Sequence, residues 1–386
     1  MSLKIEFAER VEKGEPIAQL CREYRISRTT GHKWAKRFAE RGYDGLEDAS
    51  RRPKTAPLAT AEDIVLAVLA VREAHPRWGP RKLEVVLRRR FGEQTPSERT
   101  IARILQRAQK VQKRRRRRPL SVVERAPEVG ATNPNDVWTV DFKGSWRTAD
   151  GQRCDPLTVR DAASRFVLAA TLCRTSTAAV RAAFEGLFRR HGVPGAIQCD
   201  NGVPFVSVRS PGGLSALSAW WVSLGIRLVR SRPACPQDNG GHERMHSDIA
   251  AEVERRGAGT RKTQQGELDK WRQEFNHVRP HQALGGKTPA EVYRPASKRP
   301  AVVRRYRYPS TMSTVRVFKN GNFRLRGDAY FLSTALAGML IGLEPIDAIH
   351  LRVWLRDLEL GVTEVAPQVS PALYAQPSTS RRRLAA

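Results

Sequence analysis

Apolar residues recur at helical spacing through the first 50 positions of the chain. They predict a helix over Lys4–Lys13 and a short second helix that carries Ile17 and Leu20. Ser27 follows a short break and is a favourable N-cap, so a third helix is expected over Arg28–Glu40. Two short helices joined by a tight turn make a helix-turn-helix, whose second helix enters the DNA major groove.

The third helix divides into an inner and an outer face. Trp34 and Phe38 are four residues apart and are expected to face the core. A plain helical bundle would show the same division, but the strong positive charge described below favours DNA binding. The candidate DNA-binding residues lie on or near the outward N-terminal face: Arg28, Thr29, Thr30, His32 and Lys33.

A similar helical unit follows after the Pro-containing linker 48–60. The pattern predicts a helix over Ala61–Glu73, a turn and a second helix within 75–92, and a third helix that begins at Ser97 as N-cap. This unit resembles a second helix-turn-helix. Two such units in tandem bind a longer DNA site than one unit alone.

From Asn133 the pattern changes to alternating strands and helices. The predicted order is three strands, helix, strand, helix, strand and then two helices, which fits a mixed sheet flanked by helices. The expected strands are 137–142, two strands within 154–173, one within 193–202 and 227–231, and the expected helices are 175–191, 214–226, 238–256 and 264–277.

Short β-like runs separated by Gly and Asn turns begin near Arg304 and predict a small β-barrel. The runs are 303–309, 313–320, 321–327, 329–333 and 350–361. The tail from 366 is expected to be disordered. The fold class is therefore multidomain, with all-α helix-turn-helix domains, an α/β core and a C-terminal β-barrel. The predicted boundaries are 1–52, 60–110, a basic linker 111–132, 133–297, 303–365 and the tail 366–386.

Charge narrows the class of partner. The chain carries 68 Lys and Arg against 39 Asp and Glu, a formal net charge of +29. Such a surplus favours a polyanion, either nucleic acid or an anionic membrane surface. The run Arg114, Arg115, Arg116, Arg117 and Arg118 is typical of a flexible arm that follows phosphates or enters a minor groove.

Membrane and disulfide-rich classes are disfavoured. A spanning helix needs ~20 apolar residues, and the longest apolar-rich segment, 335–343, is shorter and contains Gly. The first residues have no apolar core, so a signal peptide is not expected. The five cysteines are scattered without a CxxC pair, which indicates reduced thiols and argues against a zinc finger. We expect a cytoplasmic, nucleoid-associated protein of a prokaryote.

Three carboxylates carry the candidate chemistry. Asp141 falls at the end of the first predicted strand, Asp200 just past a later strand, and Glu243 in the first turn of a helix. Carboxylates at strand ends of an α/β sheet converge in one crevice. Three oxygen ligands suit Mg²⁺ or Mn²⁺, and two such ions clamp the attacking and leaving oxygens of a phosphodiester. Singly each signal is weak, because an Asp after a strand, such as Asp161, is more often a turn former.

The residues 133–295 resemble the catalytic core of integrases and insertion-sequence transposases of the DDE class, with their ribonuclease-H-like fold. The resemblance rests on colinear motifs: W-T-V-D-F at 138–142, D-A-A-S-R-F at 161–166, C-D-N-G at 199–202, P-x-x-N-G-x-x-E-R at 236–244 and R-P-H-Q-A-L-G-G-K-T-P-A-E-V-Y at 279–293. The flanking segments also resemble that organisation. Two departures are a longer interval between Asp200 and Glu243, with 207–217 as the insert, and the missing zinc-binding domain of retroviral integrases.

The resemblance implies a polynucleotidyl transferase that cleaves transposon ends and joins them to target DNA. Asp141 would touch two Mg²⁺ or Mn²⁺ ions, and Asp200 and Glu243 would each complete the shell of one ion. The partners would be double-stranded DNA and further copies of the chain. Supporting roles are implied for Asn201, Asn239, Gly240 and His246, and phosphate contacts for Lys143, Arg244 and His246.

Two alternatives remain open. The segment His242–His246 satisfies H-E-x-x-H, the zinc metalloprotease motif, with Glu243 as its general base. A protease would leave the positive charge and the helix-turn-helix units unexplained. The second alternative is a catalytically inactive DNA-binding regulator derived from a transposase, which the presence of all three carboxylates disfavours.

Overall fold

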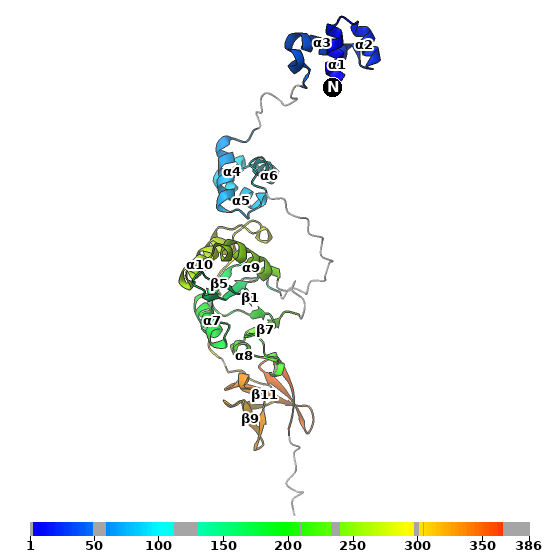
Figure 1. The fold of residues 1–386 in the computed structure, drawn as a ribbon. Helices are drawn as coiled ribbons and strands as arrows, with labels where there is room; N and C mark the ends of the chain where they lie inside the picture. The colour runs from blue at the N-terminus through cyan, green and yellow to red at the C-terminus, as the bar shows by residue number, and fades with distance from the viewer. Residues whose placement is uncertain are drawn as a thin grey trace, which may run out of the picture. The chain divides into compact units, whose positions relative to one another are not determined.

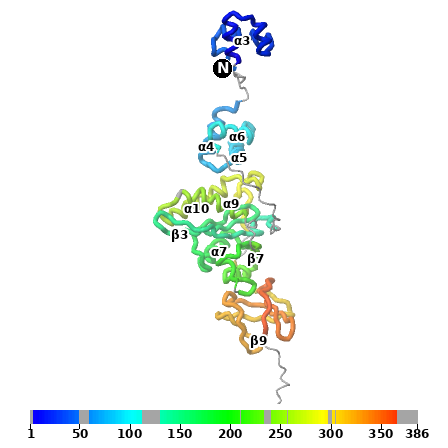
Figure 2. Tube along the Cα trace, turned by 45° about the vertical axis from the view of Figure 1, so that its right-hand side comes forward, coloured from blue at the N-terminus to red at the C-terminus, as the bar shows by residue number. Residues whose placement is uncertain are grey.

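The computed structural model describes residues 3–48, 59–111, 130–208, 210–232, 240–296, 301–303 and 305–365 (Figures 1 and 2). The chain divides into two compact units, Met1–Val65 and Leu66–Ala386. No helix within these described ranges has the length and apolar character needed to cross a membrane. The basic run Arg114–Arg118 lies outside the described residues.

The first unit is a three-helix cluster of α1 (Leu3–Glu12), α2 (Ile17–Glu23) and α3 (Arg28–Arg41), followed by η1 (Gly42–Leu46). The side chain of Ser27 accepts a hydrogen bond from the backbone N–H of Thr30, so the predicted N-cap is confirmed. Of the two residues predicted to face inward, Trp34 packs edge-on against Phe7, 5.6 Å between ring centroids. Phe38 is half-buried outside that core cluster and packs against Tyr43 of η1, 5.2 Å between ring centroids.

Gly31 explains how closely the helices of the first unit approach each other. A Cβ at this buried position would lie 2.3 Å from Cys21 Sγ and 2.9 Å from the ring of Phe7. Only glycine lets α3 pack this closely against α1 and α2. The close contact fixes the orientation of α3, whose opposite face is exposed.

The second helical segment contains α4 (Glu62–Ala74), α5 (Pro80–Phe91) and α6 (Glu98–Arg107), with η2 (Gly92–Gln94) between the last two. Ser97 caps α6 as predicted, accepting from Thr100 N. Leu83 and Leu87 of α5 and Ile101 and Leu105 of α6 are buried.

The α/β core is built on a five-stranded mixed sheet of order β5-β4-β1-β6-β7. β1 pairs antiparallel with β4 and parallel with β6, and β6 pairs parallel with β7. The strands are β1 (Val137–Phe142), β4 (Pro156–Asp161), β5 (Val167–Leu172), β6 (Ala196–Cys199) and β7 (Arg227–Arg230). The predicted order of strands and helices matches this arrangement.

Helices cover both faces of the sheet (Figures 1 and 2). On one face, α7 (Thr177–His191) and α8 (Ala216–Ser223) form the main core with the inward residues of β1 and β4. On the other face lie α9 (Gly240–Glu252) and α10 (Arg261–His277), which pack on β5. Trp138 and Val140 of β1 belong to the first core, so the alternation of a strand turns Thr139 and Asp141 toward α9.

Small elements were not predicted. The hairpin of β2 (Trp146–Arg147) and β3 (Arg153–Cys154) follows β1, although Asp150-Gly151 is a recognised turn signal. Within the described residues, further short helical segments are η3 (Pro211–Gly213), η5 (Glu254–Arg256), η6 (Gln282–Leu284) and α11 (Pro289–Val292).

The C-terminal segment consists of antiparallel strands in two sheets, a four-stranded sheet β13-β12-β11-β8 and a separate pair β10-β9. The described strands therefore do not confirm a closed barrel. The strands are β8 (Ser313–Arg316), β9 (Asn322–Leu325), β10 (Asp328–Phe331), β11 (Leu340–Pro345), β12 (His350–Leu355) and β13 (Leu358–Glu364), with η7 (Thr334–Leu336) before β11. The predicted β-like run at 303–309 forms no strand over its described residues, and β11 was not predicted.

The four-stranded sheet β13-β12-β11-β8 shares a hydrophobic core with helix α8 of the α/β core. Leu214, Ala219 and Val222 lie in one buried cluster with Ile341 and Leu343 of β11. One face of α8 thus packs on the main core and the other on the C-terminal sheet. This double burial accounts for the nearly continuous apolar sequence of α8.

Candidate active site at the ends of β1 and β6

Asp141 and Asp200 lie side by side at the carboxyl ends of two parallel strands. β1 and β6 are in register with Val140 opposite Cys199. Asp141 is the next residue of β1, and Asp200 is the first residue after β6. Adjacent strands are about 4.8 Å apart, which sets the scale of the separation between the two backbones. Burial raises the pKa of the Cys199 thiol to about 12, and the charges of Asp200 and Asp141 both contribute.

The loop after β6 fixes the carboxylate of Asp200. Gly202 N donates a hydrogen bond to Asp200 Oδ1 at 3.1 Å, and a Cβ at Gly202 would lie 2.9 Å from Oδ2. Asn201 Nδ2 donates to the carbonyl oxygen of Ser231 at 2.9 Å and so ties this loop to the end of β7. Asn201 therefore supports the loop through its backbone partner on the neighbouring strand.

A polar stripe runs along the same face of β1 and β4. The register places Asp141 opposite Thr158 and Thr139 opposite Arg160. The Thr158 hydroxyl donates to the carbonyl oxygen of Asp141 at 2.9 Å. This stripe faces α9, which contributes two histidines to it.

Both histidines of α9 hydrogen-bond to Thr158. His246 Nε2 lies 2.8 Å and His242 Nδ1 3.2 Å from the Thr158 hydroxyl, and His242 Nε2 lies 2.7 Å from the Thr139 hydroxyl. Because the Thr158 hydroxyl donates to the carbonyl of Asp141, its oxygen accepts from His246 Nε2. His246 then carries its proton on Nε2, and its Nδ1 bears a lone pair.

That lone pair lies beside a carboxylate. His246 Nδ1 is 3.9 Å from Asp141 Oδ2. Burial, with the nearby charges of Lys143 and Arg160, lowers the pKa of His246 to about 4, so the imidazole is neutral at physiological pH. Burial likewise lowers the pKa of His242 far below its ordinary value. A neutral imidazole nitrogen next to a carboxylate oxygen is a donor pair suited to a divalent cation.

Among the residues that the structure describes, Asp141, His242 and His246 form a group whose candidate ligand atoms all lie within 4.8 Å of one another. The three residues are not equally available to a metal ion, because both ring nitrogens of His242 hydrogen-bond to threonine hydroxyls. His242 is fully buried and holds α9 against the sheet. Asp141 and His246 are the members whose donor atoms face each other.

Glu243 is exposed in the first turn of α9. Within the described residues, Asp141, Asp200 and Glu243 do not form a set of ligand atoms as close as the group that contains the two histidines. The structure thus brings the two aspartates together and places His246, rather than Glu243, beside Asp141. Gly240 is the exposed first residue of α9, and Asn239 lies outside the described residues.

Lys143 and Arg244, which were both predicted to contact phosphate, differ in how exposed their side chains are. Lys143 forms an ion pair with Glu254 and lies over the ring of Trp146, 4.7 Å from its centroid, with 11% of its side chain exposed. Arg244 is exposed on α9 and is the more accessible cation.

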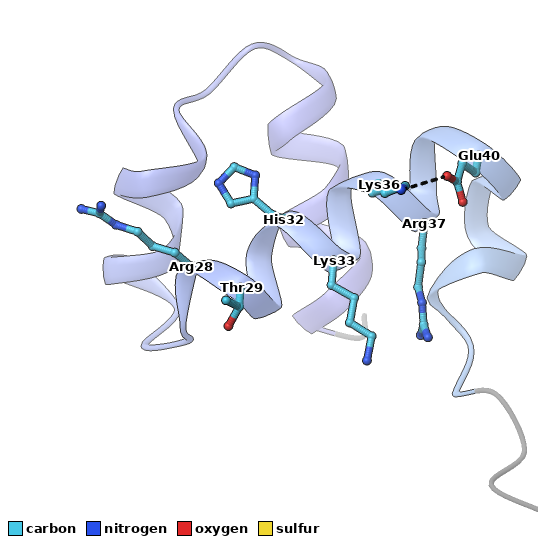
Figure 3. A pocket seen from close by; sticks show the side chains of 7 residues that line it. All are labelled: Arg28, Thr29, His32, Lys33, Lys36, Arg37 and Glu40. Atoms are coloured by element: carbon cyan, nitrogen blue, oxygen red, sulfur yellow. Dashed lines mark ion pairs between the residues drawn. The ribbon is translucent and has the colours of Figure 1, made fainter.

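The face of α3 in the first unit forms a shallow, mostly basic groove (Figure 3). Thr30 is not part of it. The hydroxyls of Thr30 and of the lining residue Thr29 both lie 2.8 Å from that of the cap residue Ser27. Lys33 and Arg37 extend in the same direction from the helix in Figure 3. The groove is lined by Arg28, Thr29, His32, Lys33, Lys36, Arg37 and Glu40.

Sequence reasoning missed Lys36 and Arg37 in this groove. Both lie four residues after predicted members of the same face, His32 and Lys33, so helical periodicity was the signal that could have found them. The adjacent carboxylate of Glu40 lies 3.9 Å from Lys36 Nζ.

Family models match segments of this chain, and no single model covers half of it. Residues 131–236 and 224–289 match models that are each described as an Integrase core domain. Residues 3–54 match a Helix-turn-helix domain and residues 30–105 a Homeodomain-like domain. The chain therefore joins DNA-binding helix-turn-helix domains to an integrase core, which confirms the resemblance stated from its motifs.

Curated relatives are proteins of bacterial insertion elements. The chain is 27% identical over 249 residues to the insertion element IS476 uncharacterized 39.2 kDa protein of Xanthomonas euvesicatoria, covering 64% of this chain and 69% of that protein. It is 28% identical over 234 residues to the insertion element IS407 uncharacterized 31.7 kDa protein of Burkholderia multivorans, covering 60% of this chain and 81% of that protein.

Solved structures of viral integrases align with parts of the chain at low scores. The HTLV-2 integrase catalytic core domain in complex with magnesium is 17% identical, with a TM-score of 0.33, and the match covers 42% of this chain and 98% of that chain. The BIV integrase catalytic core domain is 22% identical, with a TM-score of 0.32, over 41% of this chain and 93% of that chain.

Proposed function

We propose that this chain is a DNA transposase that binds the ends of a mobile element and catalyses metal-dependent strand cleavage and strand transfer. The observation that carries the proposal is the adjacency of Asp141 and Asp200 at the carboxyl ends of β1 and β6. The matches to helix-turn-helix and integrase core models support the proposal, because such domains would bring DNA to that pair of carboxylates.

The donor set fits divalent metal ions. Asp141 and Asp200 would hold Mg²⁺ or Mn²⁺, with the Glu243 carboxylate and His246 Nδ1 as further donors. Carboxylate oxygens suit Mg²⁺ and Mn²⁺, and an imidazole nitrogen tilts the preference toward Mn²⁺. Two ions bound there would supply activation of the attacking oxygen and stabilisation of the leaving oxygen.

The remaining residues hold the metal-binding side chains in place and bind the DNA. Gly202 and Asn201 keep the Asp200 carboxylate at the strand end, and Thr158 orients His246 toward Asp141. The basic groove of α3 binds the element's end, and Arg244 contacts phosphate near the reacting bond. Because joining two DNA ends requires two such sites, we expect a homo-oligomer on double-stranded DNA.

The test uses labelled double-stranded DNA from the segment that flanks the gene, with the full chain and Mg²⁺ or Mn²⁺. Wild type is expected to cut the DNA at the element's end and to join it to a second duplex. Asp200→Asn is expected to bind the same DNA and leave it intact. If wild type and Asp200→Asn are equally inert while both bind DNA, the enzyme assignment fails and the inactive DNA-binding regulator is correct.

The zinc metalloprotease alternative is not favoured by the geometry of its motif. A protease site needs both histidines with free nitrogens toward an open metal position. Here His242 is fully buried and both of its ring nitrogens bond to threonine hydroxyls. Copurifying zinc, together with loss of activity in His242→Ala but not in Asp141→Asn, would reverse this choice.

A further inference from the structure

A buried arginine gathers three carboxylates on α9 and α10. Arg279, from the R-P-H motif, has 2% of its side chain exposed, and its Nη1 lies 3.0 Å from Asp248 Oδ2. Its Nη2 pairs with Glu252 and lies 3.5 Å from Glu274 Oε1. One guanidinium balances only one of three carboxylates, so the cluster keeps an excess of negative charge that favours a further cation.

The turn between α4 and α5 supplies that cation. Arg77 Nη2 lies 3.1 Å from Asp248 Oδ1, and its Nε lies 3.7 Å from Glu252 Oε1. His75 Nδ1 lies 3.3 Å from Glu274 Oε1, and the His75 ring stacks on Trp78 at 3.7 Å. The two side chains from one short turn therefore contact all three carboxylates around Arg279.

The contact continues along α5. Arg89 Nη2 lies 3.0 Å from Glu291 Oε2 in α11, at the far end of the same motif. A Cβ at Gly286 would lie 3.4 Å from Val85 of α5, so the loop before α11 approaches the helix directly. Residues 279–291 and the carboxylates of α9 and α10 thus form one surface, which we name the docking surface, and α5 with its preceding turn lies on it.

Because α5 lies on the docking surface, the outer face of α6 stays exposed to solvent. Ile101 and Leu105 turn into the helical segment's own core. Arg99, Arg103 and Arg107 are four residues apart and exposed, so they form one line along the outer face of α6. An exposed line of arginines on the last helix of a helix-turn-helix is suited to phosphate and base contacts in DNA.

We propose that Arg77 and Arg279 are positioning residues that couple DNA bound on α6 to the candidate active site. The inference rests on the proposed transposase function. Asp248 and Glu252 lie on α9, the helix that also carries Glu243 and His246. Anchoring the α4–α5 turn to these carboxylates sets the distance between DNA held by α6 and the catalytic end of α9.

The experiment compares Arg77→Glu with Arg81→Glu in the full chain. Arg81 is an exposed arginine of α5, so both variants lose the same charge from the same helical segment, and only the first faces the docking surface. Three quantities are measured: affinity for the DNA end, single-turnover cleavage at saturating DNA, and amide hydrogen exchange of α9. Arg77→Gln serves as a milder second variant.

At saturating DNA, Arg77→Glu is expected to cleave roughly tenfold to a hundredfold more slowly than Arg81→Glu, the scale of a small misplacement of a reacting group. DNA affinity should be alike in both variants, and exchange of α9 should be faster only in Arg77→Glu. Equal cleavage and equal exchange would overturn the proposal, as would a selective loss of DNA affinity in Arg77→Glu. If wild type binds DNA without cutting it, the proposed function fails, and exchange of α9 still decides the docking.

Discussion

The Thr158 hydroxyl and His246 Nε2 lie 2.8 Å apart across the interface between β4 and α9. Because the same hydroxyl donates to the carbonyl of Asp141, it determines which nitrogen of His246 carries the proton. The free Nδ1 then faces the Asp141 carboxylate. Thr158 thus links β1, which carries Asp141 near its end, to α9, the helix that carries Glu243.

Thr158→Val keeps the shape of the side chain and removes this hydroxyl. Two imidazole nitrogens and one carbonyl oxygen lose a hydrogen-bond partner, so the free energy of unfolding should fall by about 1–3 kcal/mol. Urea unfolding measures it. Thr171→Val, an exposed threonine of β5, is the control and should change stability by less than about 0.5 kcal/mol. An equal effect in the two variants would show that the hydroxyl network contributes nothing.

Gly202→Ala should disable cleavage without loss of DNA affinity. The new Cβ would lie 2.9 Å from Asp200 Oδ2, so the carboxylate or the loop must move. Cleavage of labelled DNA should fall roughly a hundredfold, as for a reacting group displaced by about 1 Å. Gly144→Ala is the control, because a Cβ there meets nothing within 4 Å. Full activity in Gly202→Ala would remove Asp200 from the reaction.

The positions of the two aspartates were predictable because each depends on local sequence. A buried strand followed by Asp predicts the strand end, and parallel pairing of β1 with β6 puts the ends together. The contact of His246 with Thr158 was not predictable in this way. It depends on how α9 is rotated over the sheet, which is decided by packing of Met245 and Ile249 in a core built from distant segments.

In the C-terminal segment, too, features that depend on local sequence were predictable and features that depend on long-range contacts were not. Individual strands such as β9 and β12 follow alternating sequence and were predicted, while the pairing that separates β9 and β10 from the four-stranded sheet depends on long-range contacts. β11 was missed because Ile341 and Leu343 are both buried and Leu340 and Gly342 blur the alternation. β11 pairs with β8 and β12 and shares a buried cluster with α8, which lies far earlier in the chain.

His191 should make the second unit less stable in mild acid. Burial, with Arg190 and Arg272 nearby, lowers the pKa of His191 to about 4 from the ordinary value of 6.5. The unfolded chain therefore binds more protons between these pH values, and stability falls as pH decreases from about 6.5 toward 4, by up to ~1.4 kcal/mol per pH unit.

His191→Leu removes this titration and should make the pH dependence of the free energy of unfolding shallower in that window. It should not abolish the dependence, because burial also lowers the pKa of His246 to about 4. Urea midpoints at pH 7.5, 6 and 5 measure it. His277→Leu, at an exposed histidine of α10, is the matched control and should keep the wild-type slope. A slope that His191→Leu leaves unchanged would assign the acid sensitivity to other groups.

Lys33→Ala and Arg37→Ala should each weaken DNA binding by the first unit. Both side chains extend from the same side of α3 into the basic groove (Figure 3). If each neutralises one phosphate, the slope of log affinity against log salt should become shallower by about 0.9 per substitution. Lys13→Ala, an exposed lysine outside the groove, should leave the slope unchanged. A change in affinity without a change in slope would mean that these residues contact bases, and no change in either would exclude this face of α3 from the DNA interface.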